Sequence, residues 1–240
     1  MGIAKTIAPS GHLRAAINFG NPVLAQKDPQ TGAPRGVSVD LARELGRRLG
    51  VPVDLVTFDA AGKVFDALKA DAWDVAFLAV DPVRANEITF TAPYVVIEGT
   101  YLVPDGSPLR AIEDVDRAGM RVAVARGSAY DLYLTRALQK AQLVRAATGV
   151  EAMDTFRRDG LDTAAGVKQA LVTFAAQHPG LRVIPGRFMI IEQAVGIPKA
   201  HDAGAAYVRA FVEEMKASGF VATALAASGQ AEASVAPASK

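Results

Sequence analysis

The sequence predicts an α/β protein of two lobes, and three observations support that prediction. Residues 13–80 follow the order strand–helix–strand–helix–strand, which is typical of a parallel sheet with helices on its faces. A second α/β set follows over residues 107–184. Two long apolar runs, Tyr94–Val103 and Phe188–Ile197, are each able to cross from one lobe to the other. The length of 240 residues accommodates one large domain or two small lobes.

The first set contains three strands, expected at Leu13–Asn18, Val53–Thr57 and Asp74–Val80. Apolar side chains four residues apart predict the helix between the first two strands: Val37, Leu41, Leu45 and Leu49. Gly50 is expected to end that helix. A second helix is expected through Val64, Phe65 and Leu68. Trp73, beside the last strand, is interpreted as a core residue.

The second set alternates strands and helices in the same way. Ser107-Pro108 predicts a helix start, because proline is favoured at the first helical position. The expected strands are Arg121–Ala125, Leu143–Ala146, Leu161–Ala165 and Leu181–Ile184. The expected helices contain Tyr130 and Leu134, then Met153 and Phe156, then Leu171 and Phe174.

Two last helices are expected around Phe211 and Val221, and the Ala/Ser/Pro-rich tail after Gly229 is expected to be disordered. We assign residues 1–97 and 196–240 to lobe 1 and residues 98–195 to lobe 2. Open α/β sheets bind ligands at their strand ends, so we expect a ligand cleft between the lobes.

The composition excludes several classes of function. The 26 basic and 25 acidic side chains leave a formal charge of +1, so bulk attraction to nucleic acid or anionic membrane is not expected. The absence of cysteine excludes disulfides, iron–sulfur clusters and thiol catalysis. Three histidines (His12, His178 and His201) are far apart, so we expect no metal site and no cofactor. No run approaches 18 apolar residues, so none is expected to span a membrane.

Two features suit a carboxylate ligand, one from each half of the chain. Arg84 follows a buried strand, where its planar guanidinium can donate two charge-assisted hydrogen bonds to a carboxylate. Gly127-Ser128 opens a helix whose backbone N–H groups favour an anion. The alternatives are a surface arginine paired with Glu87 and an ordinary serine N-cap. The combination of both features favours the ligand interpretation.

Four further polar residues are candidates for ligand contact. Asn18 and Asn21 follow the first strand, where they either contact a ligand or form the loop. Glu98 and Glu192 lie in the expected crossovers, where each faces solvent, contacts a ligand ammonium or donates a proton.

Several motifs resemble those of one known family. Residues 35–41 read Arg-Gly-Val-Ser-Val-Asp-Leu, and residues 90–94 read Phe-Thr-Ala-Pro-Tyr with Arg84 six residues before the phenylalanine. They resemble the signatures of family 3 extracellular solute-binding proteins, the polar-amino-acid receptors of ABC importers. The other matching segments, in the family's order, are Phe65–Leu68, Trp73–Ala76, Arg126–Ser128 and Asp159–Asp162. The resemblance covers about Leu13 to Gly229.

The resemblance implies a type II periplasmic-binding-protein fold, in which two α/β lobes are joined by two crossover strands with a ligand cleft between them. It assigns the ligand's α-carboxylate to Arg84, Ser128 and Gly127, with a further contact at Ala79 where the preceding strand is two residues shorter than in the family. Asn21 stands where the family has an aromatic residue that stacks on the ligand. Val167 stands where the family has the aspartate that binds the ammonium.

The sequence therefore predicts a receptor that retains the anion half of an amino-acid site and lacks the usual acid for the ammonium. Unless Glu98, Glu192, Asp59 or Asp81 replaces that acid, the ligand is a carboxylate without an α-ammonium. Asp162 is interpreted as structural.

The predicted function is a solute-binding protein that closes on a small carboxylate-bearing ligand for ABC-type uptake. Its expected partners are that ligand and an ABC permease in the membrane, and a monomer with no catalytic residue is expected. One alternative is a dehydratase of prephenate or arogenate type with Glu192 or Glu98 as the general acid. Another is a cytoplasmic small-molecule sensor. The N-terminal residues lack the apolar core of a secretory signal, so the location is periplasmic if an export signal was removed and otherwise cytoplasmic.

Overall fold

The computed structural model describes residues 2–239 and divides the chain into two compact units. Unit 1 is formed by the chain up to Val96 and again from Glu192, and unit 2 is formed by Ile97–Ile191. The chain passes from one unit to the other inside two long strands, β7 (Val95–Pro104) and β12 (Met189–Pro198). Both strands lie in the apolar runs noted in the sequence.

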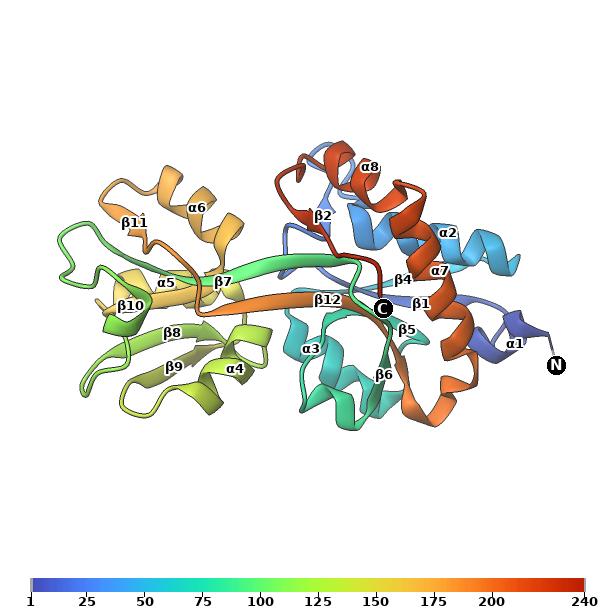
Figure 1. The fold of residues 1–240 in the computed structure, drawn as a ribbon, viewed down its shortest axis with the longest axis horizontal. Coiled ribbons are helices and arrows are strands. Elements are labelled where there is room, and N and C mark those ends of the chain that lie inside the picture. Colours follow the sequence, from blue (N-terminus) through green and yellow to red (C-terminus); the bar gives the residue numbers. More distant parts are fainter. Residues whose placement is uncertain (1, 240) are drawn as a thin grey trace. The chain divides into compact units, whose positions relative to one another are not determined.

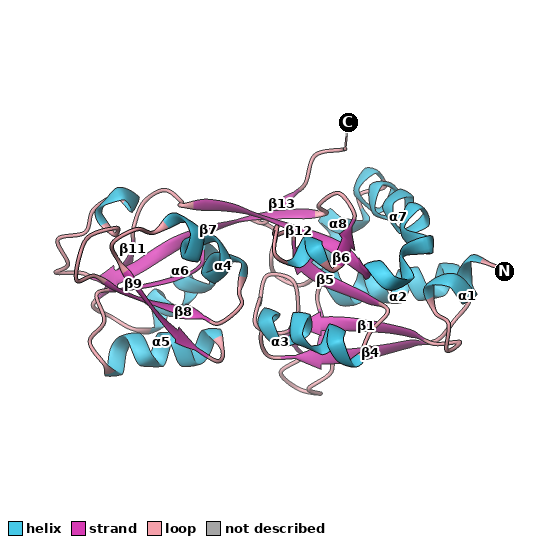
Figure 2. Cartoon of the chain, turned by 90° about the horizontal axis from the view of Figure 1, so that it is seen from below, coloured by secondary structure: helices cyan, strands magenta, loops and turns pink. Residues whose placement is uncertain are grey.

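Unit 1 is built on a sheet in which β1 lies between β4 and β5, parallel to both, as Figure 2 shows. The unit 1 part of β12 pairs antiparallel with β5 and with β6. The strands are β1 (Leu13–Asn18), β4 (Val53–Phe58), β5 (Val75–Ala79) and β6 (Ile88–Phe90), with a hairpin of β2 (Gln26–Lys27) and β3 (Pro34–Arg35). The helices are α1 (Ile3–Ile7), α2 (Val37–Leu49), α3 (Ala61–Asp66), α7 (Ala205–Ala217) and α8 (Phe220–Ala227). Short 3₁₀ helices are η1 (Ala67–Ala70), η2 (Arg84–Asn86) and η4 (Lys199–Gly204).

Helix α2 forms where the four-residue apolar spacing predicts it. Val37, Leu41 and Leu45 are fully buried, while Arg43 and Arg47 on other sides are exposed. Gly50 ends the helix in the left-handed conformation, with φ of 68°, and its N–H donates to the carbonyl oxygen of Arg47. In Figure 1, α2, α7 and α8 lie side by side in unit 1, and helix contacts join α8 to both of the others.

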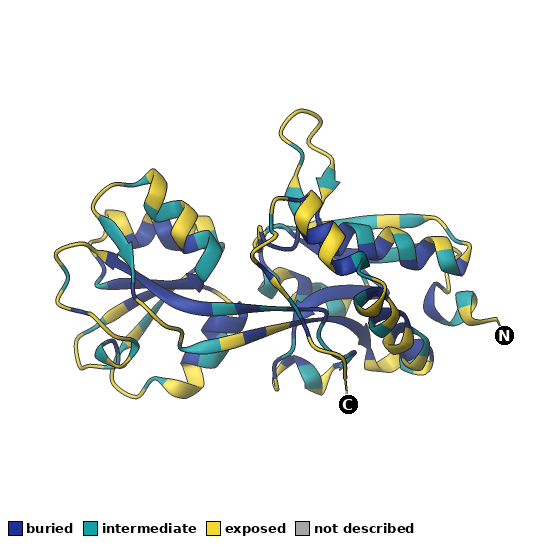
Figure 3. Cartoon of the chain, turned by 45° about the horizontal axis from the view of Figure 1, so that its top comes forward, coloured by how far each residue is buried: buried dark blue, intermediate teal, exposed yellow. Residues whose placement is uncertain are grey.

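Trp73 is a core residue, as predicted, with no exposed surface. Its indole N–H donates to the carbonyl oxygen of Val64, 2.9 Å away, so the buried polar atom is satisfied. The core around it also contains Ala16, Ala76, Leu78 and Ile88. Figure 3 shows the buried strands in dark blue and the outer sides of the helices in yellow.

Unit 2 is built on a sheet of order β9–β8–β10–β7, in which β8 is parallel to β9 and to β10 and β7 is antiparallel to β10. The strands are β8 (Arg121–Ala125), β9 (Gln142–Ala146), β10 (Thr163–Val167) and β11 (Leu181–Val183). The helices are α4 (Ala129–Ala137), α5 (Gly149–Arg158) and α6 (Lys168–Gln177), with the 3₁₀ helix η3 (Ile112–Asp114). The core contains Leu102, Met153, Phe156, Leu161 and Leu171.

The helix start expected at Ser107-Pro108 is wrong. The Ser107 hydroxyl accepts the N–H of Leu109, and the Ser107 N–H donates to the Pro104 carbonyl, which closes a turn instead. The guanidinium of Arg182 donates to the carbonyl oxygens of Ser107 and Leu109, at 3.0 and 2.6 Å. These carbonyls are therefore bonded to a side chain 75 and 73 residues away and do not start a helix.

The disorder expected after Gly229 is also wrong. Strand β13 (Ser234–Val235) pairs antiparallel with Val95 and Val96 at the start of β7. The N–H of Ala236 donates to the Tyr94 carbonyl oxygen, 3.0 Å away. The backbone of the tail is therefore ordered by pairing with β7, although its composition suggests disorder.

Candidate functional site

Arg84 lies five residues after Ala79, at the carboxyl end of β5, in the 3₁₀ helix η2. Its side chain is buried, and Nη1 donates to the carbonyl oxygen of Ala79, 2.9 Å away. Burial lowers the pKa of Arg84 to about 10, and the nearby Asp81 carboxylate acts in the opposite direction. The guanidinium is therefore still charged at neutral pH, as a carboxylate-binding group must be.

Asn18 is the last residue of β1, the strand next to β5, and Asn21 lies in the loop that follows. Both are buried, and each forms a local turn: Asn18 Oδ1 accepts the N–H of Gly20 at 2.9 Å, and Asn21 Oδ1 accepts that of Val23 at 3.3 Å. Because β1 and β5 are parallel, their carboxyl ends lie at one edge of the unit 1 sheet. This edge thus brings together Asn18, Ala79 and Arg84.

An aromatic residue at this edge was missed from the sequence. Phe19 directly follows β1, and the Lys27 ammonium lies 5.3 Å from the centre of its ring. The resemblance places a stacking aromatic residue at position 21, where this chain has Asn21. Phe19 is two residues earlier. The signal was Phe19 itself, the single aromatic residue in the loop after the first strand.

Gly127 and Ser128 lie between β8 and α4 in unit 2. Ser128 is the N-cap of α4, and its Oγ accepts the N–H of Asp131 at 3.1 Å. The Gly127 N–H donates to Asp131 Oδ2 at 2.8 Å, and Asp131 in turn binds Arg145 Nε at 2.8 Å. The helix start therefore already holds a buried carboxylate of its own chain. The signal that the sequence prediction missed was the aspartate three residues after Ser128.

Val167 is buried and directly precedes α6, whose first residue is Lys168. Strands β8 and β10 are parallel, with Thr163 opposite Val122, so Val167 and Gly127 lie at the same edge of the unit 2 sheet. Lys168 Nζ binds Glu98 Oε2 at 2.8 Å, and Arg187 Nη1 binds Glu98 Oε1 at 2.5 Å. Hydrogen bonds from Lys168 and then Arg187 hold the pKa of Glu98 below its ordinary value.

The remaining acidic candidates are Asp59, Asp81 and Glu192. Asp59 is exposed and binds Lys63 Nζ at 2.8 Å. Asp81 Oδ1 accepts the N–H of Val83 at 2.8 Å, and the side chain of Glu192 is exposed. Within residues 2–239 there is no group of three acidic or histidine side chains that could hold a metal ion. No helix in the same range is long and apolar enough to cross a bilayer.

Asp162 has the structural role that the sequence suggested. Its Oδ2 accepts the N–H of Arg121 at 2.8 Å, which joins the start of β10 to the start of β8.

Comparison with known proteins decides the family. The family model for bacterial extracellular solute-binding proteins, family 3, matches residues 13–227. The chain belongs to this family. A glutamine-binding protein of Geobacillus stearothermophilus is 21% identical over 200 residues, which are 81% of this chain and 76% of that protein.

Solved structures of family members share the fold. An amino acid ABC transporter substrate-binding protein from Streptococcus pneumoniae, bound to L-arginine, superposes with a TM-score of 0.80 at 19% identity, over 98% of this chain and all of that one. The ancestral amino acid-binding protein AncCDT-1, a precursor of cyclohexadienyl dehydratase, has a TM-score of 0.77 at 21% identity, over 95% and 99% of the two chains. The chain therefore has the type II periplasmic-binding-protein fold that the resemblance implied.

Proposed function

We propose that this chain is the solute-binding protein of an ABC-type importer and that it binds a small organic acid. The buried, charged guanidinium of Arg84 at the end of β5 is the observation that supports this function most directly. A guanidinium removed from water gains most from an anionic partner with two parallel acceptor oxygens, which a carboxylate provides.

In this proposal both units contact one ligand. In unit 1 the ligand contacts Arg84 and Asn18. In unit 2 it contacts the start of α4 at Gly127 and Ser128. The Asp131 carboxylate already accepts the Gly127 N–H, so the ligand has to bind the Ser128 hydroxyl or the neighbouring N–H groups of α4. A ligand with contacts to both units favours the closed state through its differential affinity, and a permease recognises that state.

The proposed ligand class follows from the charged side chains near the carboxyl ends of the strands in the two units. Val167 offers no carboxylate for an α-ammonium, and its neighbour Lys168 is a cation. Glu98 is bound by two cations and Asp59 by one. We therefore propose a carboxylic acid without an α-amino group as the ligand.

The dehydratase alternative receives no support at Glu98. A general acid needs a pKa raised toward neutrality, whereas Lys168 and Arg187 lower the pKa of Glu98. A solute-binding role outside the cytoplasmic membrane also agrees with the family's description.

A thermal-unfolding screen tests the proposed function. The panel contains pairs of α-amino acids and deaminated acids of the same carbon skeleton. A ligand at one hundred times its Kd stabilises the protein by about 2.7 kcal/mol, which raises Tm by roughly 5–10 °C for a chain of this size. We expect shifts with deaminated acids. Shifts with amino acids alone would contradict the ligand class, and no shift with any acid would contradict the function.

A further inference from the structure

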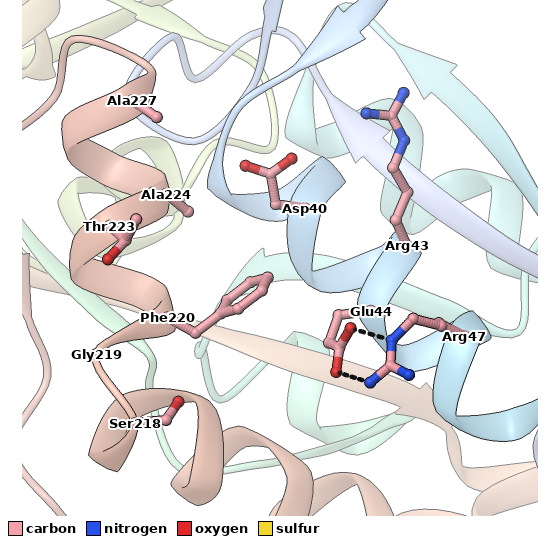
Figure 4. A pocket seen from close by; sticks show the side chains of 10 residues that line it. All are labelled: Asp40, Arg43, Glu44, Arg47, Ser218, Gly219, Phe220, Thr223, Ala224 and Ala227. Atoms are coloured by element: carbon pink, nitrogen blue, oxygen red, sulfur yellow. Dashed lines mark hydrogen bonds and ion pairs between the residues drawn. The ribbon is translucent and has the colours of Figure 1, made fainter.

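A hollow of about 570 Å³ lies in unit 1 between α2 and α8, apart from the candidate carboxylate site (Figure 4). One face of each helix lines it, at positions spaced by three and four residues. The α2 face consists of Asp40, Arg43, Glu44 and Arg47, and the α8 face consists of Phe220, Thr223, Ala224 and Ala227. The volume is in the range of small-molecule sites.

The charged wall has one carboxylate that is already satisfied. Glu44 accepts hydrogen bonds from Arg47 Nε and Nη2, at 2.7 and 2.8 Å, and from Arg48 Nε at 2.8 Å. These bonds lower the pKa of Glu44 to about 2. The charges of Glu44 and Arg47 therefore neutralise each other, and neither side chain is expected to bind a charged ligand strongly.

Asp40 is different. Its side chain is partly buried, and within residues 2–239 no group donates a hydrogen bond to its carboxylate. Burial raises the pKa of Asp40, and the charge of Arg43 opposes that rise only in part. Asp40 is also the aspartate of the Gly36–Leu41 motif, which has no part in the carboxylate site.

The opposite wall is mostly apolar, with the hydroxyl groups of Ser218 and Thr223 as its polar groups. In Figure 4 the carboxylate of Asp40 points toward α8, and the ring of Phe220 projects into the hollow between the two helices. Ala224 and Ala227 add small apolar surfaces along the same face. An apolar body can thus lie on α8 while a charged end reaches Asp40.

We propose that this hollow binds a primary ammonium group on an apolar stem, with the ammonium at Asp40 and the stem against Phe220 and Ala224. A cation fits better than an anion, because Arg43 is exposed and donates to the Pro34 carbonyl oxygen, whereas the Asp40 carboxylate has lost part of its contact with water without gaining a hydrogen bond. The ammonium belongs either to a free alkylamine or to a lysine side chain of another protein.

The first test is an NMR titration of the full chain with n-butylammonium, followed through the backbone amides. We expect saturable shifts confined to residues 40–47 and 218–227. The matched probe is n-butyrate, which has an apolar stem of similar length and the opposite charge. Equal shifts with both probes, or no saturable shift with n-butylammonium, would overturn the proposal.

Two variants separate the charge effect from loss of structure. Asp40→Asn should weaken n-butylammonium binding about tenfold, and Arg43→Gln should strengthen it about twofold, because the two side chains act on the cation with opposite sign. Asp154→Asn, an exposed aspartate on α5, should leave the affinity unchanged. Unchanged affinity in Asp40→Asn would overturn the proposal, provided that its amide spectrum shows a folded protein.

A binding experiment with peptides distinguishes the two sources of the ammonium group. The probe is a blocked helical peptide with one lysine flanked by leucines, compared with its glutamine counterpart. Tighter binding of the lysine peptide than of n-butylammonium supports a protein partner, and weaker binding supports a free amine. Equal binding of the lysine and glutamine peptides would contradict recognition of the ammonium.

Discussion

The guanidinium of Arg84 donates from Nη1 to the carbonyl oxygen of Ala79, 2.9 Å away, and so joins the 3₁₀ helix η2 to the end of β5. This bond fixes the orientation of the planar guanidinium at the carboxyl end of β5. Asp81, two residues after Ala79, supplies the nearby negative charge. The proposed carboxylate contact therefore depends on a short loop that is held by its own arginine.

Replacing Arg84 by lysine keeps the charge and removes the two parallel donors. We expect ligand affinity to fall about 30-fold or more, because a point charge does not reproduce a bidentate contact. The protein should also lose about 1–2 kcal/mol of unfolding free energy, since the hydrogen bond to Ala79 is weakened. Isothermal titration and urea unfolding measure the two effects. An unchanged Kd would remove Arg84 from the site.

Replacing Asp131 by alanine tests the helix start in unit 2. The change removes the acceptor of the Gly127 N–H and leaves Arg145 without its buried counter-charge, so we expect a loss of about 2–3 kcal/mol in unfolding free energy. Arg145→Gln keeps the carboxylate at the helix start and should cost less. If both variants are equally stable, the Asp131–Gly127 bond contributes nothing to the fold.

Glu44 gives unit 1 a defined response to acid. Its folded pKa of about 2 is below the ordinary 4.5, so the pair with Arg47 and Arg48 stabilises the fold above about pH 4.5. That contribution is lost as the pH falls toward 2. Urea unfolding at several pH values should show the wild type losing its advantage over Glu44→Gln in this window. An advantage that persists unchanged below pH 2 would contradict the assignment.

The C-terminal tail should contribute measurably to stability. Deleting residues 231–240 removes the β13 pairing with Val95 and Val96 and one of the carbonyl acceptors of the buried Lys216 ammonium, at Pro237. We expect a loss of about 2–4 kcal/mol, or roughly 5–15 °C in Tm. Glu232→Ala, an exposed change within the same tail, serves as the control. Equal Tm values for the deletion and the wild type would contradict the observed pairing.

Sequence patterns predicted the parts of this structure that depend on local periodicity. The spacing of Val37, Leu41 and Leu45 defines the buried face of α2, and the apolar run Asp74–Val80 contains β5. The resemblance to the family was sufficient for the fold because it spans most of the chain, from about Leu13 to Gly229. The structure places Arg84 after a buried strand, as the sequence indicated, and its contact with a ligand stays a prediction.

Most of the features that were not predicted from the sequence depend on contacts between distant residues. Arg182 donates a hydrogen bond to a carbonyl oxygen that a helix starting at Ser107 would use. Val235 pairs with Val95 at the start of β7. The occupation of the Gly127 N–H by Asp131 is local, but it changes what the helix start can offer a ligand. Glu98 was a candidate for an ammonium contact, and its two cationic partners become visible only in the fold.

Binding of a carboxylic acid from the screen, compared with binding of its carboxamide, tests the central claim most directly. Isothermal titration with the wild type and with Arg84→Lys gives four affinities. We expect tight binding only for the acid with the wild type, and losses of about 30-fold or more in the other three combinations. Equal affinities of the wild type for the acid and the carboxamide would contradict recognition of a carboxylate by Arg84.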